Sequence, residues 1–289
     1  FKNQRKLSFD NGQGKCCMIA QIQFVANVVA SGIGAYTDWK TGYIYDWITY
    51  PLIAAGILLS LYTGEWLGIV FGLLIYGIGI LAYKTGKIGG GDIKLLAGLA
   101  AVQPTFEGMI FVIAVLLKAS LGACIGLCVY YVGNYLLTKP KIAWNTTRKK
   151  MGFALILVLE AYIWWAHTQG LFSNYAGLFL GAGVFFGGIF YAFETEIKQH
   201  AFLTRISLEK VEDDEVVATE HLNEEEKKRF GKEIPALIGR EDVLRLRHLG
   251  FHTIPVYRNL PKFAPFLFLG VLITYLFPQW IAGLVPAIL

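Results

Sequence analysis

The chain has 289 residues, of which 55% are hydrophobic, 15% are aromatic and only 16% are charged, and its formal net charge is +5. Its mean hydropathy of +0.50 lies outside the range of ordinary soluble domains. The composition therefore excludes a soluble globular protein and predicts an integral membrane protein, in which each spanning helix needs about 20 apolar residues.

Apolar runs predict the membrane helices. They cover residues 18–37, 47–63, 66–83, 93–103, 106–137, 151–168, 175–193 and 263–288. The run 93–103 is too short for a standard crossing, so it predicts either a thin crossing or a re-entrant half-helix, which needs protein or a water-filled cavity around it.

The charged residues are concentrated in one segment. Residues 194–262 hold 14 of the 21 acids, 12 of the 26 bases and four of the five histidines. This segment predicts a small water-exposed α+β domain, and its slight excess of acids disfavours binding to nucleic acid. The expected fold class is thus an all-α polytopic membrane protein with six to eight membrane helices and a small cytoplasmic α+β domain.

These patterns divide the chain into four parts. They are a polar amino-terminal tail (1–17), a membrane helical domain (18–193), a soluble cytoplasmic domain (194–262) and a carboxy-terminal membrane helix (263–289). The tail carries four bases against one acid and is treated as added sequence outside the fold. Basic residues follow the first, third and fifth apolar runs. If 93–103 counts as a crossing, the positive-inside rule places these three loops, and residues 194–262, in the cytoplasm.

Two of the acids in the membrane part point to chemistry. Ionisable groups at membrane depth are costly and are candidates for function. Asp38 and Asp92 both lie at the expected cytoplasmic ends of apolar runs. Two carboxyls held close together share a proton, so one deprotonates a water while the other protonates a scissile carbonyl. This arrangement predicts aspartic protease chemistry.

Three consecutive glycines, Gly89, Gly90 and Gly91, precede Asp92. Without Cβ atoms they permit unusual backbone angles and the close approach of another segment, such as an extended substrate. Asp92 then opens a helix, where a carboxylate is favoured. Lys94 is expected to hold an anionic lipid headgroup or to tune the carboxyl pair. The alternative interpretation is a tight loop in which Asp92 is only a helix cap and Asp38 is an unrelated loop residue.

The stretches "GGGDIK" and "AYTDWKTGYIYDW" resemble the two signatures of the type IV prepilin and archaeal preflagellin peptidases, a family of membrane aspartic proteases with a G-x-G-D motif. The resemblance implies that Asp38 and Asp92 are the catalytic pair, that Gly89 and Gly91 are the motif glycines, and that Lys94 is the motif lysine.

A third stretch, "NLPKFAPFLFLG", resembles the proline-rich entry to the last helix of these enzymes. The resemblance implies that Pro261 and Pro265 line the active site. One departure concerns Tyr45, which stands where many members have proline and leaves open the conformation that follows Asp38.

The resemblance implies an endopeptidase that removes a short basic leader from preflagellin (archaellin) or type IV pilin-like precursors at the cytoplasmic membrane face. Its partners would be these precursors and membrane lipids. Members of the bacterial branch also methylate the new amino terminus and carry an insert with paired cysteines. That insert is missing between Asp38 and Asp92, so the chain resembles the compact archaeal branch. We expect no cofactor, no metal and no methylation.

A transporter or ion pathway is the alternative function. It would use Asp38, Asp92, Lys118 and Glu160 as membrane-embedded charges. The sequence lacks a pair of broken helices in two matched halves, which favours the peptidase. Lys118 lies inside the long apolar run, where lipid snorkelling or a buried carboxylate partner would account for it.

Overall fold

The computed structural model describes residues 2–84, 88–138, 146–171, 173–211, 215–223, 226, 237–238, 240–258 and 261–278. Side chains are described from residue 17 onward, except those of residues 237 and 240. Its contacts divide the chain into two compact units. The first unit comprises Phe1–Ile80, Gly89–Gly122 and Lys262–Ala282, and the second comprises Leu81–Ile88, Ala123–Pro261 and Gly283–Leu289.

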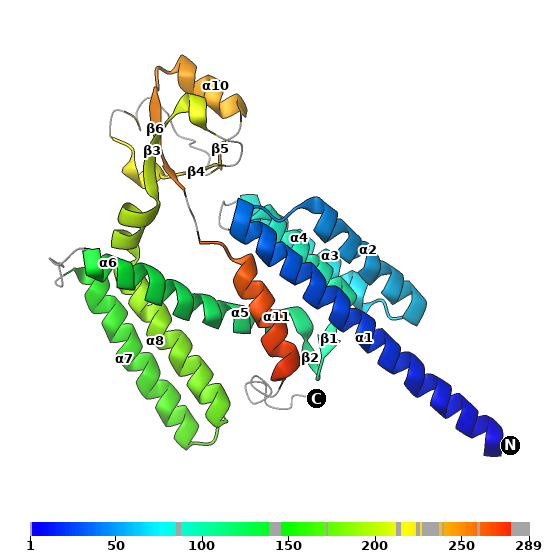
Figure 1. The fold of residues 1–289 in the computed structure, drawn as a ribbon. Helices are drawn as coiled ribbons and strands as arrows, with labels where there is room; N and C mark the ends of the chain where they lie inside the picture. Colours follow the sequence, from blue (N-terminus) through cyan, green and yellow to red (C-terminus); the bar gives the residue numbers. More distant parts are fainter. Residues whose placement is uncertain are drawn as a thin grey trace. The chain divides into compact units, whose positions relative to one another are not determined.

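The first unit is a helical bundle (Figure 1). It is built from α1 (Lys2–Thr41), α2 (Asp46–Thr63), α4 (Gly90–Val102), α11 (Ala264–Leu276) and most of α3 (Leu67–Lys84) and α5 (Phe111–Leu127). A hairpin of β1 (Thr105–Phe106) and β2 (Met109–Ile110) joins α4 to α5. The α1 helix begins at Lys2, so it runs through the amino-terminal tail that was expected to lie outside the fold.

The short helix α4 is the buried centre of this unit. All residues from Leu95 to Val102 are buried, and α4 contacts both α1 and α2. Glycines permit the close contacts: a Cβ atom added at Gly56 of α2 would lie 2.5 Å from the carbonyl carbon of Ala101. One added at Gly68 of α3 would lie 2.4 Å from the Ala101 carbonyl oxygen. Small residues at helix contacts are typical of packing within membranes.

The length of α4 also fits the expectation from the sequence. Its 13 residues span about 20 Å, which is less than the hydrocarbon core of a bilayer. A helix that ends inside the membrane needs protein around its terminal backbone groups. The packing of α1, α2 and α3 supplies that protein.

Five helical segments in the described part of the chain are long and apolar enough to cross a membrane. They are Cys17–Thr41, Leu67–Lys84, Phe111–Thr138, Thr147–Thr168 and Asn174–Phe202. The helices α2 and α11 are shorter or less apolar and do not join this group. Most residues of the five segments lie on the surface, as expected of helices that face lipid. The prediction of a polytopic helical membrane protein is confirmed, although six to eight such helices were expected.

Two apolar runs differ from their predicted form. The run 106–137 begins with the hairpin, whose turn places Glu107 and Gly108 at positive φ, and continues through α5, the π-helix η1 (Cys128–Val132) and α6 (Gly133–Thr138). The predicted carboxy-terminal helix is α11, which ends at Leu276, and the residues from 279 onward lie outside the described part of the chain.

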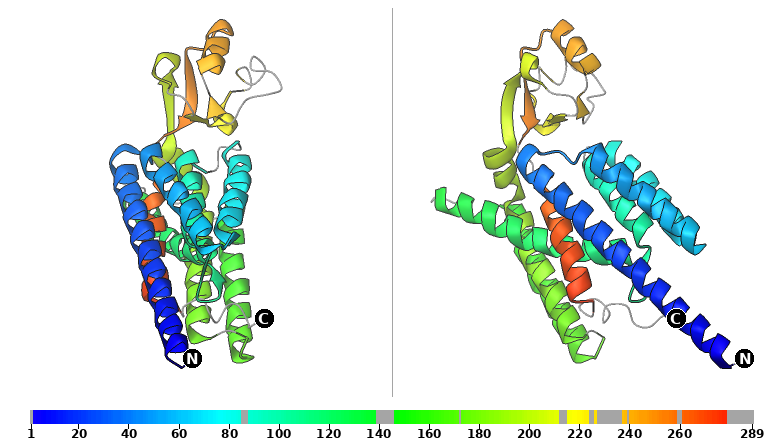
Figure 2. Two further views of the ribbon diagram at one scale, coloured as in Figure 1. Left: turned by 90° about the vertical axis from the view of Figure 1, so that its right-hand side faces the viewer. Right: turned by 45° about the vertical axis from the view of Figure 1, so that its right-hand side comes forward.

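The second unit contains the helix pair α7 (Thr147–Thr168) and α8 (Asn174–Ile197), which pack side by side (Figure 2). Glycines again bring the two backbones together. A Cβ atom added at Gly188 would lie 2.4 Å from Cγ1 of Ile156, and one added at Gly152 would lie 2.8 Å from Cβ of Ala192. A short π-helix, η2 (Lys198–Phe202), extends α8 toward the sheet.

The charge-rich segment forms a small sheet with a helix. Its strand order is β3-β6-β4-β5, and every pairing is antiparallel. The elements are β3 (Leu203–Ser207), η3 (Leu208–Lys210), β4 (Glu215–Val217), η4 (Thr219–His221), β5 (Leu237–Ile238), α10 (Arg240–His248) and β6 (Thr253–Tyr257). Its core includes Ile206, Leu246 and Ile254. The predicted mixture of helix and strand is present in this segment.

Candidate active site

Asp38, near the end of α1, forms a hydrogen bond with the beginning of α11. It lies in the last turn of α1, and only 7% of it is exposed. Its Oδ2 atom accepts a hydrogen bond of 3.2 Å from the backbone N–H of Ala264, the first residue of α11. The first N–H groups of a helix lack partners within the helix and favour a negative charge beside them. The carboxylate is thus held in place by a helix that lies 226 residues later in the chain.

Lys262 approaches the same end of α1. Its Nζ donates a hydrogen bond to the carbonyl of Trp39, and its positive charge acts on Asp38. Pro265 follows Ala264 in the first turn of α11, where the missing N–H costs no hydrogen bond within the helix. Pro265 therefore lies beside the partner of Asp38. Pro261 belongs to the second unit, and its place at the active site stays a prediction.

Asp92 belongs to the first turn of α4, as predicted. Its Oδ1 atom is buried and has no hydrogen-bond partner among the described residues. The charge of Asp38 acts on Asp92, so the bundle brings the two carboxyls within electrostatic range of each other. A buried acceptor without a donor is costly. The Oδ1 atom is therefore suited to accept a hydrogen bond from a water molecule or from a polar group of a substrate.

The glycine run gives Asp92 its surroundings. Gly89 is the N-cap of α4 and Gly90 is its first residue. A Cβ atom added at Gly89 would lie 3.0 Å from Oδ2 of Asp92, so the missing side chain leaves room for the carboxyl. A Cβ atom added at Gly91 would lie 2.9 Å from Cβ of Ile44 and 3.1 Å from its carbonyl oxygen. The segment that approaches Gly91 is therefore the chain's own loop between α1 and α2.

Lys94 has a different partner from the two that the sequence suggested. Its Nζ lies 2.6 Å from Oδ1 of Asp46, the first residue of α2, and 5.1 Å from the centre of the Tyr50 ring. These contacts attach α2 to α4. Lys94 thus supports the bundle that carries Asp92.

Replacing Lys94 by Met is expected to lower stability only slightly. The ion pair is partly exposed to solvent, with 24% of the Lys94 and 56% of the Asp46 side chain exposed, and such pairs contribute about 0–1 kcal/mol. Thermal unfolding in detergent should therefore show a small drop for Lys94→Met and a similar drop for Asp46→Asn. The double variant should be no less stable than either single variant. A loss of several kcal/mol in the free energy of unfolding would show that the ion pair between Lys94 and Asp46 contributes more than a surface pair does.

The backbone at Tyr45 shows how this residue takes the place of the proline found in many members of the resembled family. Tyr45 is the N-cap of α2, with φ of −78° and ψ of 146°. Proline fixes φ near −65° with a spread of about 15°, so Tyr45 adopts a conformation that proline would also allow. The loop after Asp38 therefore keeps the path expected of a proline at this position.

Aromatic side chains surround the end of the bundle that carries Asp38. Six are exposed between residues 36 and 50: Tyr36, Trp39, Tyr43, Tyr45, Trp47 and Tyr50. At the other end of α2, Tyr62 and Trp66 are also exposed. Tyr and Trp gather at the two membrane–water interfaces, so α2 is bounded by aromatic residues as a membrane-crossing segment would be. The aspartates lie at the end of the bundle that carries the first of these two aromatic groups.

Two further membrane charges belong to different units. Lys118 lies in the first unit, and its Nζ donates to the carbonyl oxygen of Phe277 at 3.1 Å. Its partner is thus neither a lipid headgroup nor a carboxylate. Glu160 lies on α7 in the second unit, beside Gly181 of α8. The four charges of the transporter alternative do not form one cluster within either unit.

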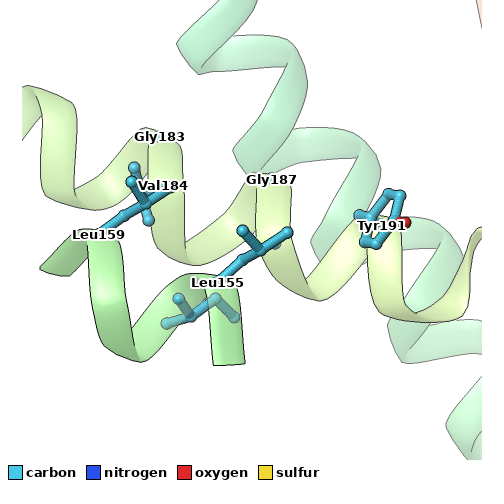
Figure 3. A pocket seen from close by; sticks show the side chains of 8 residues that line it. Leu155, Leu159, Gly183, Val184, Gly187 and Tyr191 are labelled. Carbon is cyan, nitrogen blue, oxygen red and sulfur yellow. The ribbon is translucent and has the colours of Figure 1, made fainter. Parts of the chain in front are cut away.

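A hollow of about 250 Å³ lies between α7 and α8 in the second unit (Figure 3). Leu155 and Leu159 of α7 border it, and Gly183 and Gly187 of α8 leave it open. Its lining is apolar except for Tyr191. Such a surface fits lipid or an apolar side chain, and apart from the Tyr191 hydroxyl its lining offers no group for acid–base chemistry.

Comparison with known protein families gave one match. Residues 25–127 match the type IV leader peptidase family. The matched region contains Asp38, the glycine run and Asp92, and it supports a protease that acts on precursor proteins. Searches of curated proteins and of solved structures gave no match. The resemblance to prepilin and preflagellin peptidases is therefore confirmed over residues 25–127, which carry the pattern of the type IV leader peptidase family.

Proposed function

We propose that this protein is a membrane-embedded aspartic endopeptidase. It removes the short basic leader from preflagellin or type IV pilin-like precursors at the cytoplasmic membrane face. The observation that carries the proposal is the position of Asp38 and Asp92 at the same end of one bundle, inside the region that matches the leader peptidase family. The charge of Asp38 acts on Asp92. The buried Oδ1 atom of Asp92 has no hydrogen-bond partner among the described residues, so it can accept a hydrogen bond from a further group.

In this proposal the two aspartates have different roles. Asp38 accepts the Ala264 N–H and lies near the positive charge of Lys262, an environment that suits a carboxylate acting as general base. Asp92 accepts no hydrogen bond at Oδ1 in the described part of the chain and suits the protonated partner. Asp38 takes a proton from water, the water oxygen attacks the scissile carbonyl carbon, and Asp92 gives its proton to the carbonyl oxygen.

Breakdown of the resulting tetrahedral intermediate completes the reaction. The carbon–nitrogen bond breaks while Asp38 returns its proton to the leaving amine, and Asp92 recovers a proton from the intermediate's hydroxyl. The products are a leader with a free carboxylate and a mature chain with a new amino terminus. This sequence consumes only water.

The location of the reaction is proposed from two features. The exposed aromatic residues around Asp38 suit a membrane–water interface. Basic residues near the same end, among them Lys40, Lys94 and Lys262, suit the cytoplasmic side under the positive-inside rule. A precursor with an apolar helix after its leader would then present its cleavage site at this depth.

The test is incubation of the purified full chain in detergent with a preflagellin precursor and, separately, with a type IV pilin-like precursor. Mass spectrometry should find a shortened product whose new amino terminus marks the leader boundary. A precursor with a substituted cleavage-site residue serves as the matched control. An intact precursor in both reactions, together with ion flux in liposomes, would refute the peptidase and favour the transport alternative.

Reversing the charge of the leader is expected to slow cleavage. Leaders in which Lys and Arg are replaced by Glu lose their attraction to the anionic inner leaflet and meet repulsion there instead, at about 1 kcal/mol per charge. The catalytic efficiency kcat/KM should therefore fall about tenfold or more, whereas the cleavage position should not change. The same comparison in uncharged detergent separates the membrane effect from contacts with the enzyme. Equal rates in liposomes would remove leader charge from the mechanism.

A further inference from the structure

The helix α11 is held at both ends by charged side chains of opposite sign. At its beginning, the carboxylate of Asp38 accepts the Ala264 N–H. At its end, the ammonium group of Lys118 donates to the carbonyl of Phe277, the residue that follows α11. Both residues are almost entirely buried, with 7% of Asp38 and 3% of Lys118 exposed.

The signs of these charges match the helix dipole. A helix carries a partial positive charge at its amino terminus and a partial negative charge at its carboxy terminus. Asp38 meets the positive end and Lys118 meets the negative end. A lysine buried in an apolar helix is costly, because its ammonium group loses its hydration. Lys118 recovers part of this cost through the Phe277 carbonyl.

Close packing fixes the sides of α11. A Cβ atom added at Gly270 would lie 2.6 Å from the carbonyl oxygen of Val115 in α5, so the two backbones nearly touch. On the other side, Gly32 of α1 lies against the Phe268 ring. A Cβ atom added at Gly32 would lie 3.3 Å from Cε2 of Phe268. Tyr275 also attaches the end of α11 to the bundle, through hydrogen bonds with Asn27 and Gln103. With its sides packed in this way, α11 is a rigid element whose two ends are each contacted by one buried charge.

We propose that Lys118 is a positioning residue for the active site. By holding the carboxy-terminal end of α11, it keeps the amino-terminal end against Asp38, and so keeps the general base oriented toward its water. This assignment rests on the proposed function for its catalytic part. Its structural part, the coupling of the two ends of α11, does not depend on any activity.

A nuclear magnetic resonance experiment tests the coupling directly. The sequence contains only two Phe-Ala pairs, Phe153–Ala154 and Phe263–Ala264. Labelling with ¹³C-carbonyl Phe and ¹⁵N Ala therefore selects two amide signals of the full chain in detergent. The Ala264 signal reports the hydrogen bond to Asp38, and the Ala154 signal, from α7 in the second unit, is the internal reference.

We expect Asp38→Asn to move the Ala264 signal upfield, because the amide loses a charged acceptor. Lys118→Met should move the same signal in the same direction without moving that of Ala154. Lys118→Arg keeps the charge and should leave both signals near their wild-type positions. If Lys118→Met fails to fold, Lys118→Gln, which is shorter and uncharged, takes its place with the same expected shift. An unmoved Ala264 signal in a folded Lys118→Met or Lys118→Gln variant would overturn the proposal.

Cleavage kinetics test the catalytic part. Lys118→Met should lower kcat about tenfold with little change in KM, since misplacement of a reacting group mainly affects the transition state. Lys118→Arg should restore most of the rate. The matched control is Lys149→Met, because Lys149 is also buried, with 1% exposed, but pairs with Glu196 in the second unit. That control should lose stability and keep kcat.

The outcomes separate the two proposals. If the wild-type chain cleaves no precursor, the proposed function fails, while the Ala264 shift still decides whether Lys118 acts on Asp38. If the wild type cleaves and Lys118→Met lowers kcat no more than Lys149→Met does, Lys118 serves stability alone and the positioning role is wrong.

Discussion

Replacing either Asp38 or Asp92 by Asn is expected to abolish leader removal, with kcat lowered by about 10³-fold or more. Asn has nearly the shape of Asp and can still accept the Ala264 N–H through its amide oxygen. It can neither take a proton from water nor give one to a carbonyl oxygen at neutral pH. Because the proposed reaction needs one carboxyl in each role, either substitution alone should suffice. Single-turnover cleavage of a precursor, followed by mass spectrometry, measures the loss.

Glu65→Gln is the matched control for these substitutions. Glu65 lies in the exposed connection between α2 and α3, away from the catalytic end of α2, and its loss should leave the rate unchanged. Both Asn variants should elute as wild type on size exclusion and unfold at a similar temperature. Near-normal turnover by Asp38→Asn or Asp92→Asn would remove that residue from the catalytic pair.

The membrane helices were predictable because their cause is local. A run of apolar residues reports that a segment faces lipid or core, and the runs at 47–63, 66–83 and 151–168 correspond closely to α2, α3 and α7. The hairpin at residues 105–110 was missed because most of it falls within the apolar run 106–137. Phe106, Met109 and Ile110 continue the apolar pattern of the helix that follows, and the turn at Glu107 and Gly108 marks the hairpin.

The catalytic candidates were predictable, whereas their supports were not. Asp38 and Asp92 stood out because carboxyls are rare in apolar runs. The partners Ala264 and Lys262 lie more than 220 residues from Asp38, and no periodicity links them. The contact between Lys94 and Asp46 likewise depends on how α2 packs against α4. Contacts of this kind follow from tertiary packing, which a single sequence does not specify.

Lys118 is conspicuous in the sequence, but the sequence does not show which group it contacts. One base within an apolar helix is a conspicuous feature, yet the residue that satisfies it is a backbone carbonyl. Every residue carries a carbonyl, so no search for an oppositely charged side chain finds this partner. Only the position of the end of α11 identifies it.

Replacing Gly91 by Ala is expected to lower kcat/KM about 10²-fold, because small displacements of catalytic groups carry costs of this size. The added methyl group would lie 2.9 Å from Cβ of Ile44 and 3.1 Å from its carbonyl oxygen. The loop between Asp38 and α2 must therefore move, or α4 must retreat with Asp92. We expect either response to shift one carboxyl relative to the other. Cleavage rates of folded variants in detergent give the measurement.

Two further variants identify the cause of that loss. Gly77→Ala is the control, because Gly77 of α3 has nothing within 4 Å of an added Cβ, and its rate should match the wild type. Ile44→Gly removes the atom closest to the methyl group added at Gly91, so the double variant Gly91→Ala with Ile44→Gly should recover part of the rate relative to Ile44→Gly alone. The recovery should be incomplete, since the Ile44 carbonyl oxygen remains. Strictly additive losses would show that Gly91 acts through something other than its contact with Ile44, such as the backbone at the start of α4.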